Sequence, residues 1–240
     1  MHPTASLAVT AAFVALPIAV AGVLAYGWVR ASPSSRSLGW RLVAIWLGAW
    51  GALGASGVLR NWTDRPPPMF VALILTLVVV VAAARSRVGA RFADGVPVAA
   101  LVGFHAFRLP LELAMHRAAD EGTMPMHMSF AGANFDIVTG ISAVVVALLA
   151  SRGLAPRWLV LGFAVISTAL LFTIMGIAIA STPPVAAFGP DKVATWVGWF
   201  PFAWLPGVLV PAALFGQLVL FRRLFADAKR AAPVRLRTSR

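Results

Sequence analysis

The sequence lacks cysteine and is poor in charged residues. Because none of its 240 residues is cysteine, the chain forms no disulfide and offers neither a thiolate metal ligand nor a cysteine nucleophile. Charged residues make up 12% of the chain, and only eight residues are acidic. Soluble globular domains carry about 25% charged residues, so this composition excludes an ordinary soluble domain.

Lysine is almost as scarce, and its placement excludes a further class of protein. The only two lysines, Lys192 and Lys229, lie outside the long apolar segments, whereas a retinal Schiff base needs a lysine inside a membrane span. The sequence also has no Gly-rich loop of the kind that holds phosphates. ATP-driven transport would therefore need another subunit.

Apolar residues are abundant and determine the predicted fold. They make up 60% of the chain, and the mean hydropathy is +0.86. Spanning helices need about 17–25 residues, and seven apolar runs are close to this length. They lie at Leu7–Val29, Leu38–Leu59, Met69–Ala84, Val96–His116, Phe135–Ala150, Trp158–Ser181 and Trp196–Phe221. The sequence predicts an all-α, polytopic transmembrane helix bundle with seven spans in one domain, residues 1–223, followed by a basic cytoplasmic tail, residues 224–240.

The basic residues indicate the orientation of the spans. With seven spans and the N-terminus outside, 15 of the 20 Lys and Arg residues lie on the cytoplasmic side and four lie outside, while Arg108 lies in the membrane. If the fourth run did not span, the split would be 9 against 11. The positive-inside bias therefore favours seven spans, with the N-terminus outside and the C-terminus inside.

The net charge of +12 also indicates a partner. In a membrane protein, basic residues between the spans are expected to meet anionic lipid headgroups at the cytoplasmic face, and we expect no nucleic acid. The second run carries Gly48, Gly51, Gly54 and Gly57. Small residues at such spacing allow close helix approach, either within the bundle or in a homo-oligomer.

Four ionisable residues interrupt the fourth run. At about 100° per residue, His105, Arg108, Glu112 and His116 fall within an arc of roughly 80° on one helix face. Ionisable groups in hydrocarbon cost about 2.5–3.5 kcal/mol each on insertion scales and normally face a bundle interior or a water-filled cavity. Arg108 near mid-membrane needs a counter-ion, and Glu112 is the nearest acid in sequence, although an anionic substrate could replace it. His105 is the central residue able to exchange protons near neutral pH.

Prolines predict breaks in two of the spans. Pro110 lies inside the fourth run, and Pro201, Pro206 and Pro211 recur in the seventh. Each proline lacks an N–H and collides with a preceding carbonyl, so we expect both helices to be kinked or locally unwound. Interrupted helices of this kind build ion and substrate sites in transporters.

The connection after the fourth span contains a methionine-rich run. Met124, Met126 and Met128 alternate around Pro125 and His127, and thioethers with an imidazole suit the soft ion Cu(I). The sequence requires no cofactor. A site for Cu(I) or another metal at this run is one hypothesis. The alternative is an apolar loop folded back on the mouth of the bundle, with methionines filling irregular gaps.

Two polar residues, Asn134 and Asp136, lie at the start of the fifth span. Both types are favoured at helix N-termini, where a carboxylate also complements the helix dipole. Because the predicted topology brings them towards the outer end of the fourth span, Asp136 is also a candidate second acid beside His116.

Several of these residues carry a resemblance to a family. The chain is similar, at the level of pattern, to an uncharacterised family of small bacterial polytopic inner-membrane proteins. The similarity rests on Arg108-Leu-Pro-Leu-Glu112-Leu-Ala-Met-His116, on Gly122, Pro125, Asn134-Phe-Asp136-Ile and Gly140, and on Trp204-Leu-Pro206, Val210-Pro211 and Arg222-Arg223. It implies a bacterial inner membrane and places Arg108, Glu112, His116, Asn134 and Asp136 ahead of other site candidates. It implies no activity.

Three classes of function remain open from the sequence. The first is a transporter-like or sensory protein with an outward-facing polar cavity built on the fourth span. The second is a metal-dependent enzyme at the outer leaflet, in which Glu112, His116, His127 and Asp136 collect a metal or provide acid and base. The third is a structural or assembly subunit whose polar stripe locks helices together. The sequence favours the first.

Overall fold

The computed structural model describes residues 4–235, and their side chains as far as residue 230. All regular elements in this range are helical. Six helices are long and apolar enough to cross a membrane, so the chain is a multi-pass, all-α membrane protein. They are α1 (Leu7–Ala31), α2 (Arg36–Ser56), α3 (Pro68–Arg85), the broken span α5–η3–α6 (Val98–Asp120), α8 (Arg157–Ala180), and α9 (Val210–Arg235) with the π-helical turn η7 (Leu205–Leu209) before it.

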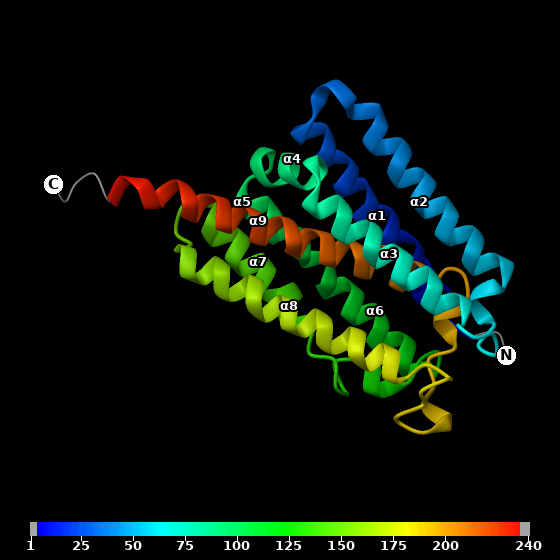
Figure 1. Cartoon of the computed structure of the whole chain (residues 1–240). Helices are drawn as coiled ribbons and strands as arrows, with labels where there is room; N and C mark the ends of the chain where they lie inside the picture. Colours follow the sequence, from blue (N-terminus) through cyan, green and yellow to red (C-terminus); the bar gives the residue numbers. More distant parts are fainter. Residues whose placement is uncertain (1–3, 236–240) are drawn as a thin grey trace.

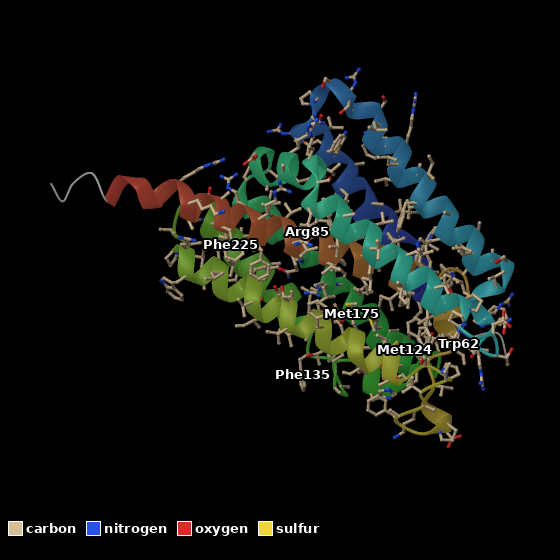
Figure 2. All side chains as sticks on the ribbon, viewed as in Figure 1. Trp62, Arg85, Met124, Phe135, Met175 and Phe225 are labelled. Atoms are coloured by element: carbon tan, nitrogen blue, oxygen red, sulfur yellow. The ribbon has the colours of Figure 1, made fainter. Side chains whose placement is uncertain are left out.

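The outward faces of these helices are apolar, as contact with lipid requires. Ile45 of α2, Ile74 of α3 and Ile166 of α8 are 58–68% exposed. Soluble monomers rarely expose contiguous apolar surface on this scale. Figure 2 shows such side chains projecting from the bundle along its length, Phe135 among them.

The helices run back and forth between two ends of the molecule (Figure 1). One end, here called the basic end, holds the connections 32–35, 86–97 and 152–156 and the outgoing part of α9. The other, here called the loop end, holds the start of α1 and the connections 57–67, 121–136 and 181–204.

Arginine side chains tie the elements together at the basic end. Arg222 donates from Nη1 to the carbonyls of Ala84, Arg85 and Ser86 at 2.9–3.0 Å, which satisfies carbonyl groups left free at the end of α3. Arg223 donates to the carbonyl of Ala93 at 2.8 Å. These contacts fix the exit of α9 against the segment that follows α3.

That segment contains a helix that the sequence analysis does not predict. The apolar runs leave no helix between Ala84 and Val96, but residues Arg87–Gly95 form α4. Phe92 of α4 is buried and packs edge-to-face on Phe215 of α9 at 5.2 Å, while its arginines stay exposed. A short amphipathic helix of this kind is invisible to a search for span-length apolar runs.

The seventh apolar helix, α7 (Ile137–Ser151), is shorter than a full span. At 1.5 Å per residue it measures about 22 Å, against about 30 Å for the hydrocarbon core. It runs antiparallel to the broken span, because Gly140 packs on the backbone of Leu109 while Gly103 lies against Ala147. Residues before α7 such as Met128 and Asn134 are buried, so part of the 121–136 connection lies inside the bundle.

The last span begins later than the sequence predicts. Residues 196–203 form the 3-10 turn η6 (Trp196–Gly198) and further turns, and the continuous helix starts only at η7. The expected unwinding around Pro206 is confirmed, since η7 is π-helical. The helix then extends to Arg235, so the first part of the predicted tail is helical, and the rest of that tail, from residue 236, lies outside the described residues.

The helix α9 is the centre of the bundle. In its apolar stretch 61% of the residues are buried, compared with 17–44% in the other five candidate spans. The broken span is second in burial at 44%, and α2 is the most peripheral at 17%. Polar side chains on the broken span and on α9 therefore have few routes to solvent.

Candidate functional site

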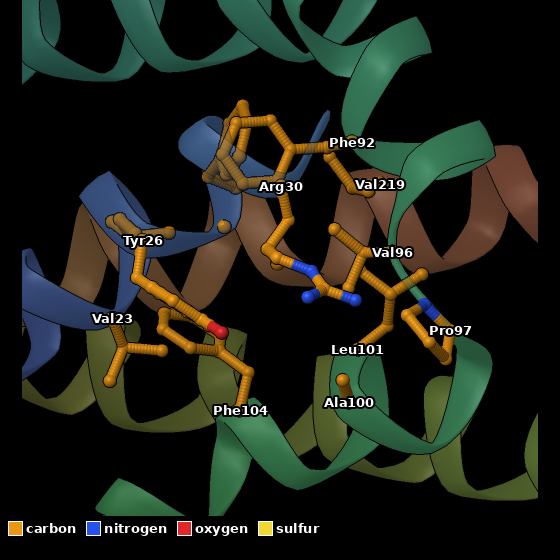
Figure 3. A pocket seen from close by; sticks show the side chains of 14 residues that line it. Val23, Tyr26, Arg30, Phe92, Val96, Pro97, Ala100, Leu101, Phe104 and Val219 are labelled. Carbon is orange, nitrogen blue, oxygen red and sulfur yellow. The ribbon is translucent and has the colours of Figure 1, made fainter. Parts of the chain in front are cut away.

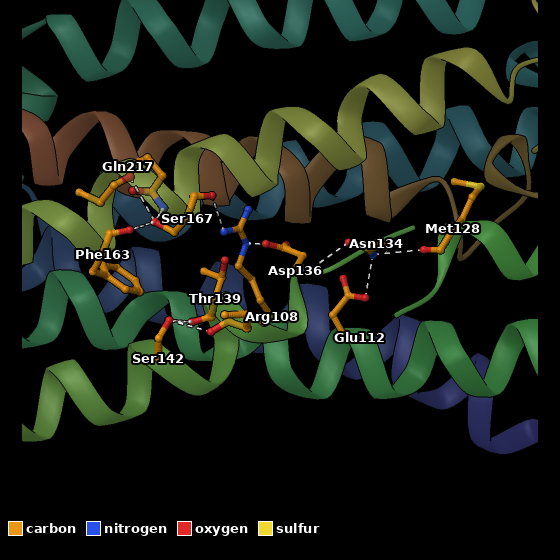
Figure 4. Close-up of polar contacts among 12 residues, drawn as sticks. Arg108, Glu112, Met128, Asn134, Asp136, Thr139, Ser142, Phe163, Ser167 and Gln217 are labelled. Atoms are coloured by element: carbon orange, nitrogen blue, oxygen red, sulfur yellow. Dashed lines mark hydrogen bonds and ion pairs between the residues drawn. The ribbon is translucent and has the colours of Figure 1, made fainter. Parts of the chain in front are cut away.

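A charged pair joins α6 to the start of α7 in the middle of the bundle (Figure 4). The Nε atom of Arg108 lies 2.9 Å from Oδ2 of Asp136, and the two side chains are 1% and 5% exposed. Arg108 is next to the middle residue of the Val98–Asp120 span, so the pair lies far from either end. The predicted N-cap position of Asp136, at the start of α7, is confirmed, but its carboxylate pairs with Arg108 and makes no capping hydrogen bond.

Glu112 has a different partner from the one its spacing suggests. It lies one turn after Arg108 on α6, but its Oε2 atom accepts a hydrogen bond from Nδ2 of Asn134 at 2.7 Å. The same amide donates to the carbonyl of Met128 at 3.1 Å, and its Oδ1 atom accepts from the backbone N–H of Asp136 at 3.1 Å. Asn134 therefore positions both acids, and the expected pairing of Arg108 with Glu112 is replaced by two separate contacts.

The network extends to α8 and α9 through residues that the sequence analysis misses. Arg108 donates from Nη1 to the carbonyl of Ser167 on α8 at 3.2 Å. The Ser167 hydroxyl accepts from Nε2 of Gln217 on α9 and donates to the carbonyl of Phe163. Gln217 is only 1% exposed. A glutamine inside an apolar span is a signal of its own, because amides are costly to bury without partners.

His105 is buried beside this network. It lies in the 3-10 segment η3 (Phe104–Phe107), which directly precedes Arg108. Gly216 of α9 provides the space for its ring, because a Cβ atom at that glycine would lie 3.0 Å from Nε2 of His105. The predicted break of the fourth span is confirmed, and it lies on the side of Pro110 that carries His105.

Five polar atoms of this group have no hydrogen-bond partner among the described residues. They are Nδ1 and Nε2 of His105, Nη2 of Arg108, Oδ1 of Asp136 and Oε1 of Gln217. A buried polar group without a partner costs about 1–3 kcal/mol. The network is thus closed to solvent but incompletely satisfied, which is unusual for a purely structural set of contacts.

We define the central network as Arg108, Glu112, Asn134, Asp136, Ser167 and Gln217, with His105 beside it. All of these are buried. The segment that covers the central network at the loop end is also buried, at Met124, Met128 and Ser129. The outward-facing polar cavity predicted from the sequence is not what these residues form, because the 121–136 segment fills the bundle at the loop end.

His116, expected in the same stripe, lies apart from the central network. Its Nε2 atom is 3.7 Å from Oδ2 of Asp120, and its side chain is 30% exposed. The ring packs against Phe130 with centroids 4.3 Å apart. In the predicted arc His116 lies at the edge. At the loop end this part of the helix surface faces the 121–136 connection, through Phe130, and not the other spans.

The methionine-rich run divides between the interior and the surface. Met124 and Met128 belong to the apolar core, whereas Met126 is exposed and its sulfur accepts from the hydroxyl of Ser129 at 3.3 Å. Nε2 of His127 lies 2.7 Å from the hydroxyl of Ser181. Burial, and to a lesser degree the positive charge of Lys192, lowers the pKa of His127. This arrangement agrees with the second alternative, an apolar loop folded back on the mouth of the bundle.

The candidate ligands of a metal-dependent site are acidic residues and histidines. Among residues 4–235, no three His, Asp or Glu side chains come close enough together to hold one metal ion. Glu112 and Asp136 lie in the central network, while His116 and His127 are held by contacts of their own at the loop end. The four residues proposed for a metal-dependent site are therefore not gathered in one place.

Comparison with known proteins assigns no family to this arrangement. No family model, no curated protein and no solved structure matches the chain.

Proposed function

We propose that this chain is a proton-linked transport protein of a bacterial inner membrane, with the central network as its proton- and substrate-binding site. The observation that supports this proposal is a charge imbalance in the middle of the bundle. One guanidinium, that of Arg108, faces two carboxylates, those of Glu112 and Asp136. With both acids ionised the group carries one uncompensated negative charge, and burial of such a charge is very costly.

A proton on Glu112 removes this imbalance. Asp136 is held directly by Arg108, whereas Glu112 is held by the neutral amide of Asn134. The other ionisable groups on the same span are Arg108, which holds Asp136, and His105, which has no hydrogen-bond partner among the described residues. Three more lie at the loop end, namely His116 beside Asp120, and Arg117 paired with Glu121. Neither histidine contacts the Glu112 carboxylate. Glu112 is therefore the group whose charge can change without breaking the ion pair.

The backbone around the central network supports a moving site. The 3-10 segment η3 precedes Arg108, and the π-helical turn η7 interrupts the span of α9. Discontinuous helices line substrate sites in many transporters, and π-turns are frequent at functional positions. The 121–136 segment closes the site at the loop end, which is what an occluded state of such a protein requires.

Arg108 gives the proposed substrate its chemical class. Its Nη2 atom has no partner among the described residues, and a guanidinium suits carboxylate or phosphate groups. A small anion that displaced Asp136 would leave both acids free to take protons. The proposal is therefore coupled uptake or export of an anion with a proton.

Infrared difference spectroscopy tests the proton. Purified protein in detergent, compared between acidic and alkaline buffer, should show the carbonyl band of a buried protonated carboxyl group. Glu112→Gln should remove that band, and Ser142→Ala, at a partly exposed position on α7, should keep it. A band that persists in Glu112→Gln would place the proton elsewhere and overturn the proposal.

Proteoliposomes test the transport. With a pH dye inside and small carboxylates or inorganic phosphate added outside, the wild-type chain should acidify the lumen faster than Glu112→Gln. Equal rates for wild type, Glu112→Gln and Arg108→Leu over the whole set of anions would contradict transport through this site.

A structural role is the second candidate, and the closure of the central network favours it. If the network only locks helices together, Glu112→Gln should leave the flux unchanged even where it removes the infrared band. The proteoliposome experiment therefore separates the two functions.

The proposed topology has seven crossings, with the loop end outside and the basic end in the cytoplasm. It is supported by the alternation of the connections between the two ends (Figure 1) and by the concentration of arginines at one of them. Because the chain has no cysteine, single cysteines can be introduced without background. An impermeant maleimide added to spheroplasts should label Thr63→Cys and not Arg36→Cys, and the reverse result would invert the topology.

A further inference from the structure

A pocket of about 340 Å³ lies near the basic end, and its inner wall includes Phe104 and Gly216, which adjoin His105. It is bounded by the last two turns of α1, by α4, by the start of α5 (Val98–Gly103) and by α9. Its walls are largely apolar and include Phe92, Leu101, Phe104 and Val219. The volume is at the lower end of the range of ligand pockets, about 300–1,000 Å³.

Arg30 is the cation of this pocket. Figure 3 shows its side chain reaching across the pocket towards Val96 and Leu101, with Tyr26 at the edge. Among the described residues, the side chain of Arg30 makes neither a hydrogen bond nor an ion pair. Two charged residues of α4, which borders the pocket, are engaged elsewhere: Asp94 pairs with Arg230 at 3.3 Å, and Arg91 donates to the hydroxyl of Ser32 at 3.1 Å.

The pocket opens sideways, in the direction of the membrane. Val23 and Tyr26 line it and are 53% and 58% exposed on α1, and Ala100 on α5 is exposed as well. Arg30 lies in the last turn of α1, at the depth where a cationic side chain meets headgroups. From Arg30 to Val23 the helix rises about 10 Å, towards the middle of the membrane.

We propose that this pocket binds one anionic phospholipid, with its phosphate against Arg30 and one acyl chain between α1, α5 and α9. A lateral opening admits a molecule that already lies in the leaflet, and the apolar depth below the cation matches a chain attached to a charged head. Inorganic phosphate would satisfy Arg30 but leave the apolar walls unused. A zwitterionic lipid would place a second cation beside Arg30. This site does not depend on the proposed transport function.

Native mass spectrometry of the full-length protein in detergent tests the site. Delipidated protein is titrated with phosphatidylglycerol, phosphatidylcholine, oleate or inorganic phosphate, and the first bound molecule is quantified. The wild-type chain should bind phosphatidylglycerol about tenfold more tightly than phosphatidylcholine, as one charge-assisted contact allows.

Three variants separate charge from shape. Arg30→Gln should abolish the preference for phosphatidylglycerol. Ala100→Phe places a ring in the pocket and should weaken binding of both phospholipids about fivefold or more. If Ala100→Phe does not fold, Ala100→Leu replaces it and should weaken binding to a smaller extent. Arg36→Gln, at an exposed basic residue of the same end that does not line the pocket, is the matched control and should behave as wild type.

Four results would overturn the proposal. An undiminished phosphatidylglycerol preference in Arg30→Gln would remove the headgroup contact, and an equal loss in Arg36→Gln would make it a general charge effect. Unchanged phospholipid binding in both Ala100 variants would remove the acyl-chain pocket. Oleate or inorganic phosphate that bound as tightly as phosphatidylglycerol would assign the site to a free anion instead.

Discussion

The Nε atom of Arg108 lies 2.9 Å from a carboxylate oxygen of Asp136, although Glu112 is one turn away on the helix of Arg108. The choice of partner determines the chemistry of the site. Asp136 and Arg108 neutralise each other across two helices, and Glu112 is left with the neutral amide of Asn134. Two acids with such different surroundings are a common basis for the division of roles between a fixed counter-ion and an exchangeable proton.

The two acids should therefore differ in their effect on stability. Asp136→Asn removes the carboxylate that contacts Arg108 directly, and breaking a buried ion pair costs about 3–5 kcal/mol. Glu112→Gln keeps an oxygen that accepts from Asn134, and we expect a loss below about 1 kcal/mol. Denaturation in mixed detergent micelles measures both. Equal destabilisation by the two variants would contradict this assignment of partners.

Glu121 attaches the start of α1 to the loop end. Its Oε2 atom accepts from the backbone N–H of Ser6 at 2.8 Å, and Oε1 accepts from Nε of Arg117 at 2.8 Å. The hydrogen bonds from Ser6 lower the pKa of Glu121 below its ordinary value of 4.5, and Arg117 adds to the effect. A carboxylate with a lowered pKa contributes stability above the pKa of the unfolded chain, and the contribution is lost as the pH falls through the folded pKa.

Acidification should therefore loosen this attachment. Between pH 6 and pH 3 the melting temperature of the wild-type chain in detergent should fall more steeply than that of Glu121→Gln. Asp191→Asn, at an exposed acid of the loop end, serves as the control and should follow the wild type. Parallel curves for wild type and Glu121→Gln would show that this carboxylate does not contribute to the pH dependence.

The methionines of the 124–128 run should separate by burial. Met128 is 1% exposed and lies in the core, whereas Met126 is 41% exposed. Met128→Ala should cost about 2–5 kcal/mol, as for other buried large-to-small changes, and Met126→Ala about 0.5 kcal/mol or less. The same unfolding measurement with added Cu(I) tests the metal hypothesis. Stabilisation of the wild type by Cu(I) that Met126→Ala abolished would favour a metal site over packing.

The arrangement of the broken span shows how far sequence periodicity reaches. The 3.6-residue period correctly places His105, Arg108 and Glu112 on the buried face, because a polar group in a span has to turn away from lipid. It does not identify the partner of Arg108. Helical spacing offers Glu112, but the competing acid comes from a loop whose path depends on tertiary packing.

The parts that the sequence does not predict share a physical cause. The α4 helix, the turns at residues 196–203 and the buried loop before α7 are short and owe their form to neighbours such as Phe215 and Asn134. Long apolar helices are encoded by local composition, and only their first and last residues differ from the prediction. The last span, for example, begins at Leu205 and not at Trp196. Short segments at the ends of a bundle gain their stability from contacts that no local pattern records.

Gly140 holds α7 close enough for Asp136 to reach Arg108. A Cβ atom at this buried glycine would overlap the backbone of Leu109 on α6, and backbone cannot move aside as a side chain can. Gly140→Ala should therefore push α7 away and cost about 1–3 kcal/mol, as overpacking does.

At Gly162 on α8 an added Cβ meets nothing within 4 Å, so Gly162→Ala should be neutral or should stabilise by up to about 1 kcal/mol, because alanine is the better helix former. Unfolding in mixed micelles compares the two. If Gly140→Ala were tolerated as well as Gly162→Ala, the close packing that brings Asp136 to Arg108 would not be needed, and the ion pair would have to be positioned by the 121–136 segment alone.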